Sequence, residues 1–307
     1  MKPIKLAFTG LLALFLLTGV AQAEEMIKPF VLADNQGSEM ATAVSTAKQK
    51  LTDAGFEIAG EYSPYDNATI VAITSESLKN TAAKTDYGVF GAAQRVTFYA
   101  TDDGVQVAYT NPIYLAHAYR LDGDLAAVTA QLEGALGKQQ TYGSKKGLSG
   151  EDLRDYQYKW LMPYFYDRLN LAGYDSYQEA VNSVEAAIAE GKGGVKPVYR
   201  IDLPDQEATV FGVNILGNTD DTECAGDEYI MERIDFKETK SLGHLPYEIV
   251  VKGNKAYALR AEFRIAISFP DLSMMGSNSF ASIMCAPSAI ETALTRAAGG
   301  KISGDDW

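Results

Sequence analysis

Two cysteines and a group of methionines are the side chains that most directly suggest chemistry. Cys224 and Cys285 make an even count, which in an oxidising compartment favours a disulfide. The alternative is a copper site, because thiolate and thioether ligands suit Cu(I). Besides Cys285, that site would use three nearby methionines, Met274, Met275 and Met284. The sequence leaves the disulfide and the copper site open, and it predicts no other cofactor.

Charged residues alternate with apolar ones from Leu259 to Ser268, which predicts a strand. On that strand Arg260, Glu262 and Arg264 would share one face, where two guanidinium groups could hold a carboxylate or phosphate. The alternative is a solvated face stabilised by cross-strand pairs. His244 lies in a predicted loop and is a further candidate for ligand binding.

Aromatic side chains are concentrated between Tyr156 and Tyr177. Trp160, Tyr164 and Tyr166 lie in the middle of this segment, where rings with polar tips would suit a ligand groove or an interface. The alternative is that the segment packs across two halves of the molecule and holds them together.

Motifs of the common enzyme classes are missing from the sequence. The chain has two histidines, no G-x-S-x-G elbow, no phosphate-binding loop and no H-E-x-x-H helix. The sequence therefore favours a non-enzymatic protein without deciding the point.

The first residues predict export. Lys2 and Lys5 precede an apolar stretch, and the small residues Ala21 and Ala23 mark a cleavage site. This pattern is typical of a signal peptide removed after residue 23, so we expect a periplasmic or secreted protein with no membrane anchor after cleavage. The net charge of −13 argues against a nucleic-acid partner, whose phosphates need basic side chains.

The remainder of the chain is organised as an internal repeat. An amphipathic helix beginning near Ala43-Val44, a glycine and two strands are followed by the same pattern from Ala180-Val181. Hairpin turns at Asp103-Gly104 and Gly253-Asn254 and a final helix then complete each copy. This order predicts an α+β fold of two tandem repeats, each an antiparallel sheet with helices packed on one face. The expected division is a signal peptide at 1–23, a first repeat at 24–146, an aromatic-rich helical connector at 147–176 and a divergent second repeat at 177–307.

The first repeat also carries a family resemblance. The segment from Val105 to Pro112, read together with an opening helix that ends at Ala54-Gly55-Phe56, resembles the bacterial domain of unknown function numbered 302. The resemblance implies a small α+β domain of the class of the TATA-binding protein, and it brings no catalytic residues with it.

Together these features predict an exported, non-enzymatic protein that binds a small ligand or a protein partner in the region between its repeats. The alternative is a redox or copper-handling protein that uses Cys224, Cys285 and the methionines. The oligomeric state is left undetermined.

Overall fold

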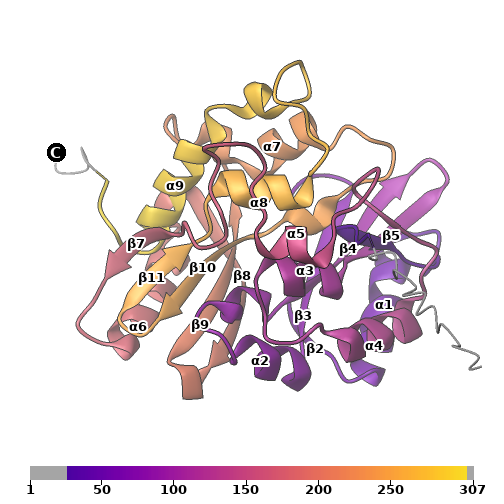
Figure 1. Cartoon of the computed structure of the whole chain (residues 1–307), viewed down its shortest axis with the longest axis horizontal. Coiled ribbons are helices and arrows are strands. Elements are labelled where there is room, and N and C mark those ends of the chain that lie inside the picture. Colours follow the sequence, from indigo (N-terminus) through magenta and orange to yellow (C-terminus); the bar gives the residue numbers. More distant parts are fainter. Residues whose placement is uncertain (1–25, 303–307) are drawn as a thin grey trace, which may run out of the picture.

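The computed structural model describes residues 26–302 and shows an α+β fold with two antiparallel sheets (Figure 1). The predicted signal peptide lies outside these residues. Within the described residues no helix is long and apolar enough to cross a membrane. We refer to residues 26–146 as the first unit, 147–176 as the connector and 177–302 as the second unit.

The first sheet has the strand order β2-β3-β4-β5-β1-β6. Its first four strands form two hairpins, the second of which turns at Asp103-Gly104 as predicted. The strands are β1 (Phe30–Leu32), β2 (Glu57–Tyr62), β3 (Ala68–Thr74), β4 (Gln94–Thr101), β5 (Gly104–Thr110) and β6 (Gln140–Tyr142).

The second sheet has the order β7-β11-β10-β9-β8. It too is built on two hairpins, and the turn at Gly253-Asn254 joins β10 to β11 as predicted. The strands are β7 (Leu169–Gly173), β8 (Val195–Leu203), β9 (Ala208–Ile215), β10 (Tyr247–Lys252) and β11 (Lys255–Ala258). The sequence predicts a helical connector, but β7 lies in the connector and pairs with β11. The connector is therefore only partly helical.

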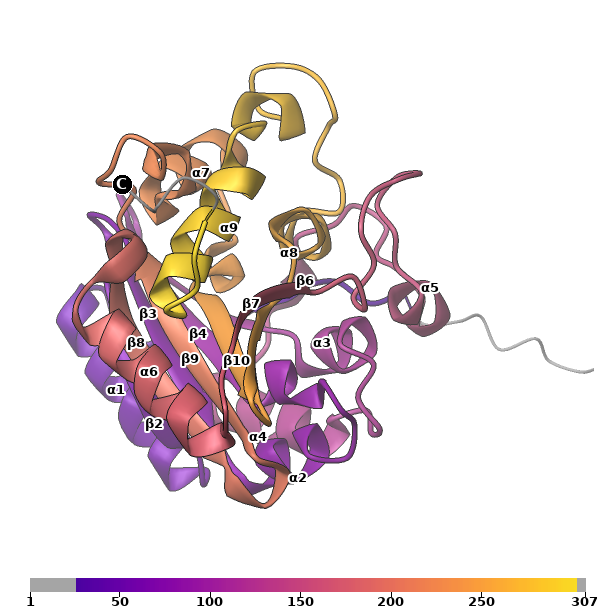
Figure 2. The ribbon, with the colours of Figure 1, turned by 90° about the vertical axis from the view of Figure 1, so that its left-hand side faces the viewer.

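Helices lie on both sides of the two sheets. Figure 2 shows α1 and α6 on one side of the sheets and α3 and α8 on the other. Ser149 and Ser176 cap the helices α5 and α6, each accepting a hydrogen bond from the backbone N–H three residues later. The helices are α1 (Met40–Asp53), α2 (Glu76–Ala82), α3 (Pro112–Ala118), α4 (Ala126–Leu136), α5 (Gly150–Arg154), α6 (Tyr177–Ala189), α7 (Asp227–Ile234), α8 (Ala261–Ser268) and α9 (Ala286–Ala297), with short 3₁₀ helices at η1 (Gly88–Gly91), η2 (Lys192–Gly194), η3 (Pro204–Gln206), η4 (Glu223–Ala225), η5 (Leu242–His244) and η6 (Phe280–Ile283).

The two units share details of strand register. In the hairpin β2–β3 a bulge separates the pairs Ile58–Ile73 and Gly60–Ala72. In the hairpin β8–β9 a bulge separates the pairs Pro197–Val213 and Tyr199–Gly212. These bulges fall at matching positions in the order of elements, so residues of one unit can be matched with residues of the other.

The edges β2 and β8 approach each other closely. A Cβ atom on Gly60 would overlap the carbonyl of Val198, so only glycine allows this approach. Gly212 has a similar role, because a side chain there would overlap the ring of Tyr199. The two units are therefore packed together over a shared core rather than separated by an open linker.

Candidate functional site

The aromatic segment of the connector has a buried part that holds the two units together. The ring of Phe165 stacks on Tyr119 of the first unit, with centroids 5.6 Å apart, and lies 5.9 Å from Phe263 of the second unit. The hydroxyl of Tyr156 donates a 3.3 Å hydrogen bond to the carbonyl of Ala266 on α8. These rings serve the packing role that was the alternative interpretation of the segment.

The other part of the aromatic segment contains three of the predicted ligand-binding residues, of which Trp160 and Tyr166 are exposed and Tyr164 is half-buried. Trp160 is 84% exposed. Tyr164 and Tyr166 stack on each other with centroids 5.0 Å apart, and the guanidinium of Arg120 lies 5.0 Å from the ring of Tyr166. The structure therefore brings Tyr164 and Tyr166 together and leaves the indole of Trp160 facing solvent.

A pocket of about 1030 Å³ lies where the connector faces the segment that follows α8. We call it the connector pocket. Its walls come from residues 144–146 at the end of the first unit, from residues of the connector between 147 and 159, and from residues 270–274 of the second unit.

Hydrogen bonds and ring contacts fix the two walls of the connector pocket relative to each other. The Tyr158 ring lies 4.9 Å from Phe280, and its hydroxyl donates to the carbonyl of Leu272. On the opposite side, Asp271 accepts a 2.6 Å hydrogen bond from the backbone N–H of Lys145. The pocket is thus bounded by segments that are tied together across the two units.

Both signs of charge line the connector pocket. The positive groups are Lys145, Lys146 and Lys159, and the negative groups are Glu151, Asp152, Asp155 and Asp271. Burial, and then the charge of Asp271, raise the pKa of Tyr158, so this hydroxyl stays protonated at neutral pH. A neutral phenol between opposite charges can contact the apolar part of a ligand while the rim binds its charged groups.

A second cluster of polar side chains is buried between the sheets. Glu248 of β10 pairs with Arg95 of β4 and Arg264 of α8, and it accepts a 2.6 Å hydrogen bond from the hydroxyl of Tyr199. Arg95, Arg264 and Glu248 are each at most 3% exposed. Burial acts to lower the pKa of Arg95, but the charge of Glu248 contributes to a net rise above its ordinary value. The cluster joins both units, and its burial makes it part of the core.

His244 belongs to this buried core and not to an exposed loop site. Its Nδ1 lies 3.0 Å from the hydroxyl of Ser268 and its Nε2 lies 3.0 Å from that of Tyr247. Burial, followed by the charges of Arg264 and Arg95, holds the pKa of His244 well below its ordinary value. The imidazole is therefore neutral and has a structural role here.

The predicted strand from Leu259 to Ser268 is wrong. Strand β11 ends at Ala258, and residues 261–268 form α8, with Arg260 as the N-cap. Glu262 is two positions from each arginine, and side chains at that spacing on a helix point in different directions. Arg264 is buried and paired with Glu248, so Arg260, Glu262 and Arg264 do not form one anion-binding face. Nearly every residue of α8 is buried, which removes the one-sided pattern by which a helix is recognised in sequence.

The two cysteines form a disulfide, as predicted. Cys224 and Cys285 are bonded, with their Cα atoms 5.9 Å apart, and the bond ties η4 to the start of α9. The three methionines of the alternative copper site are exposed: Met274 by 41%, Met275 by 75% and Met284 by 80%. Among the described residues no group of three or more His, Cys, Asp or Glu is placed to hold a metal ion.

Several residues of these sites were not singled out from the sequence. Lys145, Lys146 and Asp271 lie in polar loops that look alike in sequence, whether or not they line a pocket. Glu248 did leave a signal, because it interrupts the apolar part of its strand. Arg95 did not, because it follows a glutamine in a strand that also contains two threonines.

The fold and these sites define an α+β protein with two antiparallel sheets, a disulfide and a pocket at the connector. Comparison with protein-family models finds no matching family. Neither the curated proteins nor the solved structures include a significant match.

Proposed function

We propose that this is an exported, non-enzymatic binding protein that takes a small ligand or a segment of a protein partner in the connector pocket. The observation that carries the proposal is the pocket itself, at about 1030 Å³ and built from both units and the connector. Ligand pockets in proteins commonly have volumes of about 300–1,000 Å³.

The lining of the connector pocket indicates the chemistry of the ligand. Three lysines and four carboxylates lie around Tyr156 and Tyr158. This arrangement suits a molecule with an apolar portion and groups of both charges, such as a peptide segment or an amino-acid-like compound. A simple anion would be repelled by the carboxylates, and a simple cation by the lysines.

Duplication is part of the proposal. The two units have the same order of helices and hairpins and the matching bulges described above. Residues from Val105 to Pro112, which carry the resemblance to the domain of unknown function 302, form β5 and the first residue of α3. We infer two copies of one α+β unit, between which the connector adds the pocket.

Export is also part of the proposal. It rests on the predicted signal peptide, and the Cys224–Cys285 bond is compatible with an oxidising compartment outside the cytoplasm.

Affinity selection followed by mass spectrometry tests the proposed binding. Immobilised protein is incubated with small-molecule and peptide extracts of the cell envelope, and the retained compounds are identified. We expect compounds that the wild type retains and that the double variant Lys145→Glu/Lys146→Glu loses. Both lysines are exposed and line the pocket, so the fold should tolerate the change.

The matched control is Lys84→Glu/Lys255→Glu, which changes the net charge by the same amount at exposed positions outside the connector pocket. It should retain the same compounds as the wild type. Equal retention by all three proteins would exclude the connector pocket as the binding site.

The exposed methionines favour one second candidate function, the handling of copper. Met284 and Cys285 are adjacent and both exposed, so a reduced chain would present a thiolate beside thioethers. Intact-mass measurement of the exported protein separates the two functions. A mass lower by two hydrogens without metal excludes copper binding at Cys285, whereas a copper adduct on a reduced chain supports it.

A further inference from the structure

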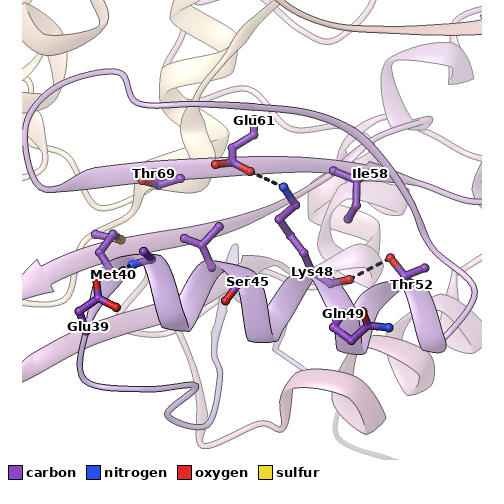
Figure 3. A pocket seen from close by; sticks show the side chains of 11 residues that line it. Glu39, Met40, Ser45, Lys48, Gln49, Thr52, Ile58, Glu61 and Thr69 are labelled. Atoms are coloured by element: carbon purple, nitrogen blue, oxygen red, sulfur yellow. Dashed lines mark hydrogen bonds and ion pairs between the residues drawn. The ribbon is translucent and has the colours of Figure 1, made fainter.

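A second pocket lies in the first unit, between α1 and the hairpin β2–β3 (Figure 3). Its volume is about 670 Å³, and we call it the α1 pocket. Met40 and Val44 of α1 and Thr69 of β3 are among the residues that line it. An ion pair between Lys48 and Glu61, with Nζ and Oε2 2.7 Å apart, lies at its side.

The second unit shows what occupies the matching place there. The sequence pair Ala43-Val44 matches Ala180-Val181, which aligns Met40 with Tyr177, the first residues of α1 and α6. The matching bulges of β2–β3 and β8–β9 align Thr69 with Thr209. The ion pair has a counterpart of reversed polarity, Glu185 with Arg200.

In the second unit a tyrosine ring fills this place. The hydroxyl of Tyr177 lies 2.7 Å from Oγ1 of Thr209. Thr209 donates its own hydroxyl hydrogen to Asp202 over 2.8 Å, so Tyr177 is the donor to Thr209. The second unit therefore contains an internal phenol bound by a threonine that a carboxylate orients.

The first unit has the matching threonine of this arrangement but no tyrosine ring beside it. Met40 stands where Tyr177 stands in the other unit, and the Thr69 hydroxyl lies at the pocket, 3.4 Å from the hydroxyl of Ser63. Ser63 takes the place of Asp202. The thioether of a methionine makes favourable contacts with an aromatic ring.

We propose that the α1 pocket binds a phenol from outside the chain, with its ring against Met40 and Val44 and its hydroxyl hydrogen-bonded to Thr69. The ligand is either a free para-substituted phenol or the tyrosine side chain of a peptide, since both present the same group. The site is separate from the connector pocket, so its test stands or fails independently of the proposed function.

The probes are p-cresol, p-xylene and N-acetyltyrosinamide, titrated against the full exported chain and followed by protein-observed NMR. We expect p-cresol to bind more tightly than p-xylene, which has a methyl group in place of the hydroxyl. Thr69→Val keeps the shape of the site and removes its hydroxyl, so it should weaken p-cresol binding by roughly 3–10-fold and leave p-xylene unchanged. Binding of N-acetyltyrosinamide would identify a tyrosyl side chain as the ligand, and its exclusion would identify a free phenol.

Two exchanges between the units provide the sharpest controls. Met40→Tyr supplies the ring from within, and it should abolish p-cresol binding and raise the thermal stability of the chain. Tyr177→Met removes the ring that lies beside Thr209 in the second unit and should create a second p-cresol site there. The proposal is overturned if p-cresol and p-xylene bind equally, if neither binds, or if Met40→Tyr leaves p-cresol binding intact.

Discussion

Replacing Glu248 by glutamine should remove the only carboxylate that directly pairs with both Arg95 and Arg264 among the described residues, while keeping the shape of the side chain. Both guanidinium groups are almost wholly buried. Removing one partner of a buried ion pair typically costs about 3–5 kcal/mol, because the remaining charge has no compensation. Here two positive charges would remain, so we expect the upper half of that range.

Equilibrium unfolding in urea measures this cost. A domain of this size commonly has a total stability of about 5–15 kcal/mol, so the Glu248→Gln variant should lose a large share of it. With a slope near 3 kcal/mol per molar, the midpoint should fall by roughly 1 M or more. Glu185→Gln is the matched control, because its ion pair with Arg200 is exposed and should contribute less than about 1 kcal/mol.

A double variant separates the charge effect from simple loss of packing. Arg95→Met/Glu248→Met removes one charge of each sign and leaves Arg264 bonded to the carbonyls of His244 and Pro246. It should be more stable than Glu248→Gln, because apolar replacements for a buried ion pair are often neutral. If Glu248→Gln and Glu185→Gln cost the same, the reasoning about the buried cluster is refuted.

Three further predictions concern the disulfide, the connector and pH. Replacing Cys224 and Cys285 by serine should lower the unfolding free energy by about 4 kcal/mol, because the bond closes a loop with a separation of 61 residues; no change in the urea midpoint would contradict this. Phe165→Ala should lower the free energy of unfolding by about 3–5 kcal/mol. Trp160→Ala, at an exposed position, should change it by no more than about 0.5 kcal/mol. A larger loss for Trp160→Ala than for Phe165→Ala in calorimetry would contradict this prediction. Burial raises the pKa of Asp235 to about 7, so the folded state holds a proton that the unfolded state releases. The stabilisation that this bound proton provides is therefore lost as pH rises from about 4 to 7. Asp235→Asn should make the urea midpoint depend less on pH in this range.

The regular elements could be predicted where a local pattern is complete. Helices α1 and α6 have one buried face and a clear end. The turns at Asp103-Gly104 and Gly253-Asn254 have residues that suit tight hairpins. For these elements the residues that decide the structure are neighbours in sequence.

The failures occur where the deciding contacts are distant. Helix α8 is buried on nearly all sides, so its alternating pattern resembled that of a strand. Strand β1 has three residues and is defined by its partners β5 and β6 rather than by its own sequence.

The sites depend even more on distant contacts. Arg95 and Glu248 are separated by 153 positions, and no local pattern relates them. The aromatic segment was recognised, but the sequence did not separate its exposed residue Trp160 from its buried residue Phe165, because that division depends on which side faces the two units.

Hydrogen–deuterium exchange tests the central claim most directly, once a compound retained by the wild type is in hand. The account predicts that the compound slows exchange in residues 144–159 and 270–274, which form the two walls of the connector pocket, and that Lys145→Glu/Lys146→Glu abolishes this protection. Protection elsewhere in the chain, with those two segments unchanged, would contradict the claim that the connector pocket is where this protein binds its ligand.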